Sequence, residues 1–290
     1  MDELKLKIVT NDYGCGTSSS ILDYGIQDVC VVSEDNFEFI FDVEDDLLFI
    51  GHDFLFYLWD NEEKLKRWQS RKEKWEHWVW CFERIDAIVP AWQQKSHHSL
   101  RLAMTFCNRV LACDEDDCDK YGFDWLPQWA SKRFYDQCDT RPTEEKILFS
   151  GQAGGPEYYA RNELLRHIKD DTFLSSLVNV TNTKRSLTWD EYIDNLLKYQ
   201  RVLNPVGILK GLNTRAFEAL YSGRFLLQQT AGQYVRHENL LKHVSNIIFF
   251  KNFDELQEIV RKSKNIVPDK NLYTQHSIYA RMKSIGVVIT

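Results

Sequence analysis

The sequence of 290 residues lacks the features that mark membrane, secreted, disulfide-rich and repeat proteins. No apolar run approaches the roughly 20 residues of a membrane-spanning helix, and the opening MDELKLK alternates in charge where a secretion signal would be apolar. None of the seven cysteines lies after Cys138, and this odd, uneven set is a poor framework for disulfides. There is no internal repeat and no low-complexity tract. These absences predict a folded, cytoplasmic protein without a transmembrane segment.

Three motifs of well-known chemistry are missing as well. The glycine pair Gly14 and Gly16 would need a third glycine at Ser19 to make a dinucleotide-binding fingerprint. No G-x-S-x-G elbow marks a serine nucleophile. The thiols and carboxylates of residues 113–119 have no second Cys/His pair at zinc-site spacing, so the sequence predicts no metal site.

Composition and charge favour two domains with different tasks. The chain is 43% hydrophobic and 27% charged, which is enough apolar material for two ordinary cores. Residues 1–140 hold 15 basic and 28 acidic side chains, a net charge of −13, whereas residues 141–290 hold 21 and 15, a net charge of +6. Eight of the nine tryptophans fall in the first half. A basic second half suggests an anionic ligand such as a phosphate.

Short β-rich runs alternate with segments of helical period, which is typical of parallel sheets covered by helices. We expect an α/β protein with two Rossmann-like domains, residues 1–140 and 141–290, joined by a polar linker at 131–146. In the first half the pattern predicts strands at 6–10, 28–33, 37–41, 46–50 and 109–113. In the second half it predicts strands at 146–150, 176–180, 202–204, 224–228 and 246–250, with helices at 157–168, 189–199, 214–221, 235–243 and 253–262.

One long helix is predicted in the first half, over residues 61–80. Apolar residues recur there at helical spacings, with Leu65, Trp68, Trp75 and Val79 on one side. Six lysines and arginines between residues 64 and 74 form a basic face. That face is either a solvated helix side or a surface that docks an acidic partner or a membrane.

Ligands of open parallel sheets bind beyond the carboxyl ends of the strands, so the loops after Ser150, Asn204 and Gln228 are the first candidates. The stretch 204–223 runs from a strand through a glycine-bearing loop at Gly211 into a helix. Asn213 or Thr214 can cap that helix, which leaves its first N–H groups and positive dipole end for an anion.

Formal charges flank the same helix start. Lys210 and Arg215 could hold a diphosphate, and Glu218, one turn further on, could accept hydrogen bonds from ribose hydroxyls. The alternative is that Arg215 and Glu218 form a surface ion pair and that Gly211 and Gly223 only shape turns.

Four segments, in order along the chain, resemble GT-B-fold glycosyltransferases of the spore-maturation (CgeB-like) type within the glycosyl transferases group 1 clan. The most extensive is LNP followed by GLNTRAFEALYSGRFLL, at residues 203–205 and 211–227, which resembles their donor-site signature. ILFSG at 147–151 resembles the strand and glycine loop that open their second domain. DWLPQWASKRF at 124–134 and YTQHSIYAR at 273–281 resemble the end of the first domain and a helix near the C-terminus.

The resemblance implies two domains facing across a cleft, with a nucleotide-diphosphate sugar as donor substrate on the second domain and an acceptor on the first. Glu218 would hold the ribose, Arg215 and Lys210 the diphosphate, and Gly151, Gln152, Gly211, Asn213 and Thr214 would line the donor site. Related retaining enzymes often carry two glutamates seven residues apart, whereas this chain has Lys210 at the earlier position, so the donor sugar is not fixed.

Transfer requires stabilising the charge on the departing diphosphate, which a helix N-terminus and two cations can do without a metal or other cofactor. The resemblance favours retention, in which the leaving phosphate assists deprotonation of the acceptor. Inversion would instead need a base from the first domain.

Candidates in the first half follow its strands. Asp12, Gly14 and Gly16 come after the first strand, where glycine lets backbone approach a sugar or phosphate closely, although such a loop is also ordinary turn structure. His52 could act as a base or bind an acceptor, and Asp53 beside it could bind acceptor or cap a helix. Glu83 is a possible acceptor-site acid near an expected strand start, although pairing of Arg84 with Glu83 or Asp86 is the simpler expectation.

The sequence therefore predicts a hexosyl- or pentosyltransferase. Two alternatives stay open, a nucleotide-sugar epimerase of the same architecture and a non-catalytic nucleotide-sugar or glycan-binding module. The acceptor has no readable code, so a glycan, a protein, a small molecule and a modified nucleic-acid base are all possible.

Overall fold

The computed structural model describes residues 4–10, 19–27, 29–33, 35–51, 57–58, 61–82, 84–85, 90–184, 186–207, 211–230, 235–262 and 276–288. The chain forms two compact units, the first made of Met1–Gln128 with Ile278–Thr290 and the second of Trp129–Ser277. No helix in the described part of the chain combines the length and the apolar character needed to span a membrane.

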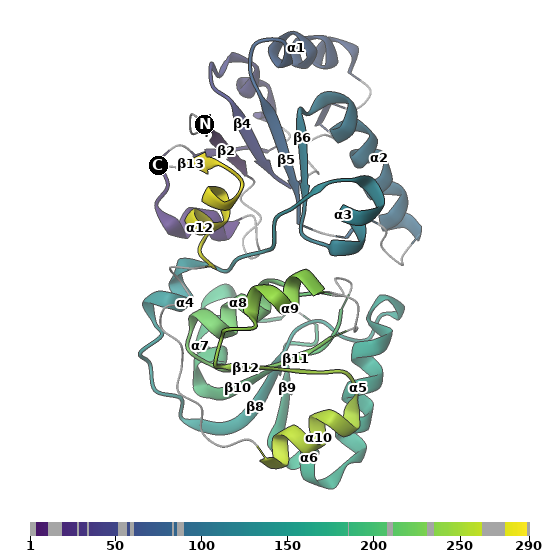
Figure 1. The fold of residues 1–290 in the computed structure, drawn as a ribbon, viewed down its shortest axis with the longest axis vertical. Helices are drawn as coiled ribbons and strands as arrows, with labels where there is room; N and C mark the ends of the chain where they lie inside the picture. The colour runs from purple at the N-terminus through teal and green to yellow at the C-terminus, as the bar shows by residue number, and fades with distance from the viewer. Residues whose placement is uncertain are drawn as a thin grey trace. The chain divides into compact units, whose positions relative to one another are not determined.

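The first unit is built on a parallel sheet with strand order β3-β2-β4-β5-β6-β7. Figure 1 labels four of these strands, β2, β4, β5 and β6. The strands are β2 (Lys7–Thr10), β3 (Val29–Val31), β4 (Leu47–Ile50), β5 (His77–Cys81), β6 (Arg109–Ala112) and β7 (Asp124–Trp125). Its helices are η1 (Ser19–Tyr24), η2 (Phe37–Asp42), α1 (Glu62–Lys72), α2 (Pro90–Phe106) and α3 (Glu115–Tyr121).

The end of the chain returns to this first unit. Strand β13 (Val287–Val288) pairs in parallel with β1 (Leu4–Lys5), and α12 (Ile278–Ser284) leads into it. The phenolic hydroxyl of Tyr279 on α12 donates to the carbonyl of Tyr24 at 3.3 Å. The boundary expected at residue 140 assigned this last segment to the second domain, whereas β13 and Tyr279 bond within the first unit.

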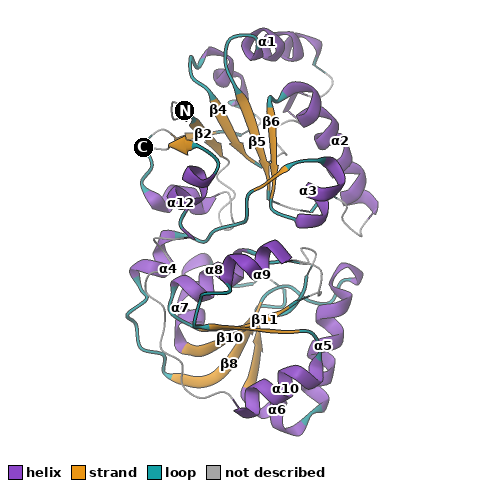
Figure 2. Cartoon of the chain, in the orientation of Figure 1, coloured by secondary structure: helices purple, strands orange, loops and turns teal. Residues whose placement is uncertain are grey.

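The second unit contains a parallel sheet with strand order β12-β11-β10-β8-β9. The strands are β8 (Glu144–Ser150), β9 (Val178–Thr181), β10 (Tyr199–Asn204), β11 (Phe225–Gln229) and β12 (Ile247–Phe250). The helices are α4 (Lys132–Asp136), η4 (Pro156–Tyr158), α5 (Tyr159–Asp170), α6 (Thr172–Leu177), α7 (Trp189–Lys198), α8 (Thr214–Tyr221), α9 (Val235–Leu241) and α10 (Phe253–Lys262). Figure 2 shows the strands of each unit bundled between helices.

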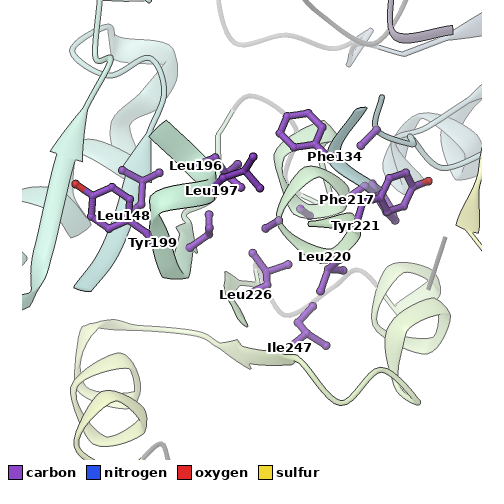
Figure 3. Packing of buried hydrophobic residues seen from close by; sticks show 14 of the residues in the cluster. Phe134, Leu148, Leu196, Leu197, Tyr199, Phe217, Leu220, Tyr221, Leu226 and Ile247 are labelled. Atoms are coloured by element: carbon purple, nitrogen blue, oxygen red, sulfur yellow. The ribbon is translucent and has the colours of Figure 1, made fainter. Parts of the chain in front are cut away.

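Both faces of the second sheet are buried. Successive strand residues point to opposite sides, so each strand contributes side chains to two cores. Leu148, Val202 and Leu226 pack with α4, α7, α8 and α9 in one core, part of which Figure 3 shows around Phe217 and Leu220. Their neighbours in the strands, such as Phe149 and Leu203, pack with α5, α6 and α10 in a second core. Each unit thus has the Rossmann-like architecture that the alternating pattern predicted, and the α/β class is confirmed. The placement of the two units across a cleft stays a prediction.

The predicted helix over residues 61–80 is wrong in its second half. Helix α1 ends at Lys72, and residues 77–81 form β5, a central strand of the first sheet. All five residues of β5 are buried, so the strand shows no alternation, and Val79 within it happened to continue the helical spacing of Trp68 and Trp75. Residues 37–41 were predicted as a strand and instead form the 3₁₀-helix η2, whose buried residues are Phe37 and Ile40.

The basic face predicted on this helix is largely paired within the protein. Lys64 and Arg67 contact Glu38, and Lys66 pairs with Glu62 one turn earlier. Lys72 donates to the carbonyl of Thr105 at 3.0 Å. Arg71 is buried and donates to the carbonyls of Ile40, Val43 and Asp45. These contacts favour a structural role for the face over a docking surface.

The linker predicted at residues 131–146 is also wrong. Ser131 caps α4 by accepting from the amide of Arg133, and Phe134 is fully buried in the second unit's core beside Trp189 and Tyr192. Strand β8 already begins at Glu144. The polarity of the segment reflects a half-buried short helix and the exposed first residues of β8. Beyond this region, the predicted elements of the second half match the structure within a few residues, whereas α6 and β13 were not foreseen.

Candidate functional site

The order of the second sheet defines where a ligand is expected. From β8 the chain goes first to β9 on one side and then crosses to β10 on the other, so the strand order reverses between β8 and β10. Ligands of open parallel sheets bind beyond the carboxyl ends of the strands at such a point. Ser150 is the last residue of β8 and is followed by Gly151, and Asn204 is the last residue of β10. Helix α8 begins ten residues after Asn204.

Arg215, in the first turn of α8, reaches both strand ends. Its Nη1 donates to Oδ1 of Asn204 at 3.1 Å. Its guanidinium lies directly against Gly151, where an added β-carbon would stand 2.7 Å from Cζ. Cζ is also 5.6 Å from the centre of the Phe149 ring. The sequence placed Gly151 and Arg215 in one donor site, and the structure brings them into contact.

The polar partners of Arg215 are neutral. Asn204 is an amide, and among the described residues no carboxylate lies within ion-pair distance of the guanidinium. Its Nε is buried without a hydrogen-bond partner, and so is the Oγ of Ser150 at the end of β8. Buried polar atoms without partners are rare in native structures and require an explanation.

Glu218 is not part of a surface ion pair with Arg215, which was the alternative reading of their spacing. It is only 5% exposed, and its Oε2 accepts the phenolic hydroxyl of Tyr192 on α7 at 2.5 Å. Burial raises the pKa of Glu218, while the Tyr192 hydrogen bond and the charge of Arg215 act in the opposite direction. Burial and then the Glu218 charge raise the pKa of Tyr192 well above its ordinary value. The carboxyl therefore sits in a low-dielectric position beside the cation.

Asn213 precedes α8 in the N-cap position, but its side chain makes no capping hydrogen bond. Instead it exchanges two amide hydrogen bonds with Asn204, at 3.2 and 3.3 Å. The expectation that Asn213 could cap the helix is therefore wrong, because the buried amide of Asn204 takes up its polar atoms. Thr214 is the first residue of α8, as predicted.

The two other predicted donor-site residues contact side chains that the sequence did not single out. The carbonyl of Gln152 accepts Nη1 of Arg161 from α5 at 2.5 Å, and Gln152 Oε1 accepts the hydroxyl of Tyr158. Gly211 lies against the buried ring of His237, where a β-carbon would stand 2.7 Å from Cε1. Arg161 and His237 carried no signal in the sequence, because neither lies in a motif and both arrive through tertiary packing.

Several predicted residues lie outside the described part of the chain. These are Lys210 on the donor side and Asp12, Gly14, Gly16, His52, Asp53 and Glu83 in the first half. In sequence, residues 11–18 come directly after β2, and residues 52–56 come one residue after the end of β4. The strand order of the first sheet reverses between β2 and β4. The roles proposed for these residues stay predictions.

The stretch after Trp80 was expected to start a strand, but it ends one, because β5 finishes at Cys81. Arg84 pairs with Asp116 at 3.2 Å, while Glu83 and Asp86, its expected partners, lie outside the described residues. The acidic run that follows β6 has structural tasks: Asp114 caps α3 through the amide of Asp116, and Asp117 accepts the amide of Ile85 at 2.7 Å. The thiol of Cys113 donates to the carbonyl of Phe82.

Comparisons with known proteins add a weak likeness to solved structures. No family model and no curated protein matches the chain. One solved structure that it resembles is an "alpha-glucosyltransferase in complex with UDP and a 13-mer DNA containing a central A:G mismatch". The two are 8% identical, the match covers 97% of this chain and 95% of the other, and the TM-score is 0.49. A likeness at this level has no bearing on function, so the proposal below uses the chain's own residues.

Proposed function

We propose that the protein is a glycosyltransferase that binds a nucleotide-diphosphate sugar at the carboxyl edge of its second sheet and transfers the sugar to an acceptor. The observation that carries the proposal is the environment of Arg215. A guanidinium placed at the switch point of a parallel sheet, held by a neutral amide and with no carboxylate partner among the described residues, retains its charge for an anion.

Two further features support an anionic ligand at this place. The Nε of Arg215 and the Oγ of Ser150 are buried and lack hydrogen-bond partners, so phosphate oxygens would satisfy them. Helix α8 points its N-terminal end toward the same strand ends, and its dipole adds to the attraction. In the proposal Lys210 supplies a second cation from the loop before α8.

Glu218 is proposed to accept a hydrogen bond from a ribose hydroxyl. An ionised carboxylate offers about four lone-pair sites, and the hydroxyl of Tyr192 uses one of them. Tyr192 would then hold the Glu218 carboxyl in place through Oε2, while Oε1 of Glu218 binds the ribose hydroxyl. Gly151, Gln152, Gly211, Asn213 and Thr214 complete the proposed donor site.

The proposed reaction breaks the bond between the anomeric carbon and the phosphate oxygen and forms a bond from the same carbon to an acceptor oxygen. The negative charge that develops on the diphosphate is stabilised by Arg215, Lys210 and the N-terminus of α8, without a metal. With retention, the departing phosphate oxygen takes the acceptor proton. With inversion, His52 or Glu83 of the first unit would take it.

The test measures nucleotide release from UDP-, GDP-, ADP- and dTDP-sugars, with and without candidate acceptors. Release that needs an acceptor supports transfer, whereas donor conversion without one supports an epimerase, and binding without release supports a binding module. The variant Arg215→Ala should lose at least tenfold in kcat/KM, since a charge-assisted contact is worth roughly 1.5–3 kcal/mol. The matched control is Arg166→Ala, which changes an exposed arginine of α5. Equal rates in both variants would contradict the assignment.

A further inference from the structure

Two buried amides, Asn204 and Gln228, lie in contact with one another at the strand ends beside Arg215. Asn204 and Gln228 are direct register partners at the ends of β10 and β11, so their side chains lie on the same face of the sheet. That face is the one covered by α8, because Val202 and Leu226, two residues earlier, pack against α8. Asn204 is fully buried and Gln228 is 2% exposed. The Nδ2 of Asn204 donates to Oε1 of Gln228 at 2.7 Å.

The direction of this amide chain is fixed at both of its ends. At one end Gln228 Nε2 donates to the backbone carbonyl of Gln229 at 2.6 Å, and a carbonyl can only accept. The Oε1 of Gln228 must therefore face Asn204 and take its Nδ2. At the other end Arg215 can only donate, and it finds Oδ1 of Asn204 at 3.1 Å. Exchanging the oxygen and nitrogen of either side-chain amide would set donor against donor, so the Asn204 and Gln228 amides have one orientation.

Asn213 does not supply this direction. It exchanges hydrogen bonds in both senses with Asn204, at 3.2 and 3.3 Å. A reciprocal amide pair can reverse both members together and keep both bonds. Apart from Arg215 itself, the carbonyl of Gln229, acting through Gln228, is what distinguishes the two orientations of the Asn204 amide.

We propose that Gln228 is a positioning residue of the donor site: it orients the amide of Asn204 so that Oδ1 holds the guanidinium of Arg215 over Gly151 for a diphosphate. This inference rests on the proposed function. Asn204 and Gln228 form a relay from the Gln229 carbonyl to Arg215. Because both are neutral amides, they orient the Arg215 guanidinium without neutralising its charge. A carboxylate at position 204 would hold Arg215 more strongly and would compete with the diphosphate for its charge.

The experiment compares the wild type, Gln228→Met, Arg215→Ala and the double variant by calorimetric titration with UDP, GDP, ADP and dTDP. The corresponding nucleosides serve as a second set of ligands. Methionine fills the space of glutamine but offers no oxygen acceptor. We expect Gln228→Met to weaken diphosphate binding about fivefold to tenfold, the value of one hydrogen bond, and to leave nucleoside binding within about twofold.

The double variant separates positioning from a structural effect. If Gln228 acts through Arg215, Gln228→Met should change diphosphate affinity less than about twofold once Arg215 is already alanine. Multiplicative effects in the two backgrounds would overturn the inference, as would wild-type affinity in Gln228→Met. Should Gln228→Met fail to fold, Asn204→Asp replaces it. The aspartate variant should lose diphosphate affinity selectively, and an equal loss for nucleosides would count against the relay.

A crystal structure of Gln228→Met keeps the inference separate from the proposed function. If no nucleoside diphosphate binds the wild type, the proposed function fails, and the relay is then decided by the coordinates alone. Displacement of the Arg215 guanidinium from Asn204 Oδ1 in the variant supports the relay. An unchanged Arg215 contact overturns it.

Discussion

The guanidinium of Arg215 occupies the space in which a β-carbon added to Gly151 would lie. A β-carbon at residue 151 would stand 2.7 Å from Cζ of Arg215 and closer still to Nη2. Gly151 also has a φ of +154°, which side-chain-bearing residues rarely adopt. We expect Gly151→Ala to push the guanidinium aside and to weaken nucleoside diphosphate binding about tenfold or more, measured by calorimetric titration.

Gly154 offers the matched control for this substitution. It lies in the same loop at a φ of +104°, but an added β-carbon there would meet nothing within 4 Å. Gly154→Ala therefore introduces backbone strain without displacing Arg215. Similar affinity losses in the two variants would mean that strain in the loop, and not the position of Arg215, controls binding.

The buried carboxyl of Glu218 predicts a pH dependence of stability with a definite sign. Its pKa is raised in the folded protein, so folding favours the protonated form. The stability it contributes is complete below its ordinary pKa of 4.5 and is lost as the pH rises through the folded value. In urea unfolding, the free energy of the wild type relative to Glu218→Gln should therefore fall as the pH rises above 4.5.

Glu191 provides a control of opposite sign. The backbone and side chain of Thr188 donate to it in a capping box at the start of α7, and these bonds lower its pKa. Relative to Glu191→Gln, the wild type should gain stability as the pH rises toward 4.5 and keep it above that value. If both glutamine variants gave the same trend with pH, the assignment of burial as the cause at Glu218 would be wrong.

The sequence predicted the second unit well because its elements obey simple periodicities. Helix α7 illustrates this: Tyr192, Ile193, Leu196 and Leu197 recur at helical spacing within the helix predicted at 189–199, and all four are buried in the core. The first unit was harder, since β5 is buried on both faces and its sequence, HWVWC, carries no alternation. When a fully buried strand follows a helix in sequence, its unbroken apolar run is easily predicted as a continuation of that helix.

The candidate site was predictable in part and for an identifiable reason. Local sequence placed Arg215 and Glu218 at the start of α8, and the strand and glycine at 150–151 could be recognised in the same way. The partners of these residues could not be foreseen, because Asn204, Gln228 and Tyr192 reach them across the sheet and between helices. Side-chain hydrogen bonds over such separations depend on register and packing, and no spacing rule encodes them.

Arg224 predicts a large stability effect away from the proposed site. This buried side chain donates to the carbonyls of Ser222, Thr140 and Leu197 at 2.7–2.9 Å and ties together three chain segments. Arg224→Met keeps the aliphatic stem but leaves three acceptors unpaired, so the free energy of unfolding should fall by about 3 kcal/mol or more. Arg166→Met, at an exposed position, should change it by less than about 0.5 kcal/mol in the same denaturant series. Comparable losses would show that Arg224 is not a structural tie.

His77 predicts acid sensitivity in the first unit. The imidazole is fully buried, stacks on Trp68 at 4.4 Å and accepts a hydrogen bond from Arg71 at Nε2. Burial, followed by the charges of Arg71 and Lys72, lowers its pKa from 6.5 to about 3. A neutral histidine in the folded state that charges on unfolding contributes stability above pH 6.5, and this stability is lost as the pH falls toward 3. The limiting slope for one proton is about 1.4 kcal/mol per pH unit.

Two measurements check this prediction. The NMR signal of the His77 ring should keep its neutral-form shift on acidification until the protein unfolds. In urea unfolding, His77→Gln should lose stability less steeply than the wild type between pH 6.5 and 4, because an amide can still accept from Arg71 and does not titrate. His243→Gln, which changes an exposed histidine, should follow the wild-type slope. A His77 signal that titrates near pH 6.5 in the folded protein would contradict the buried, neutral ring.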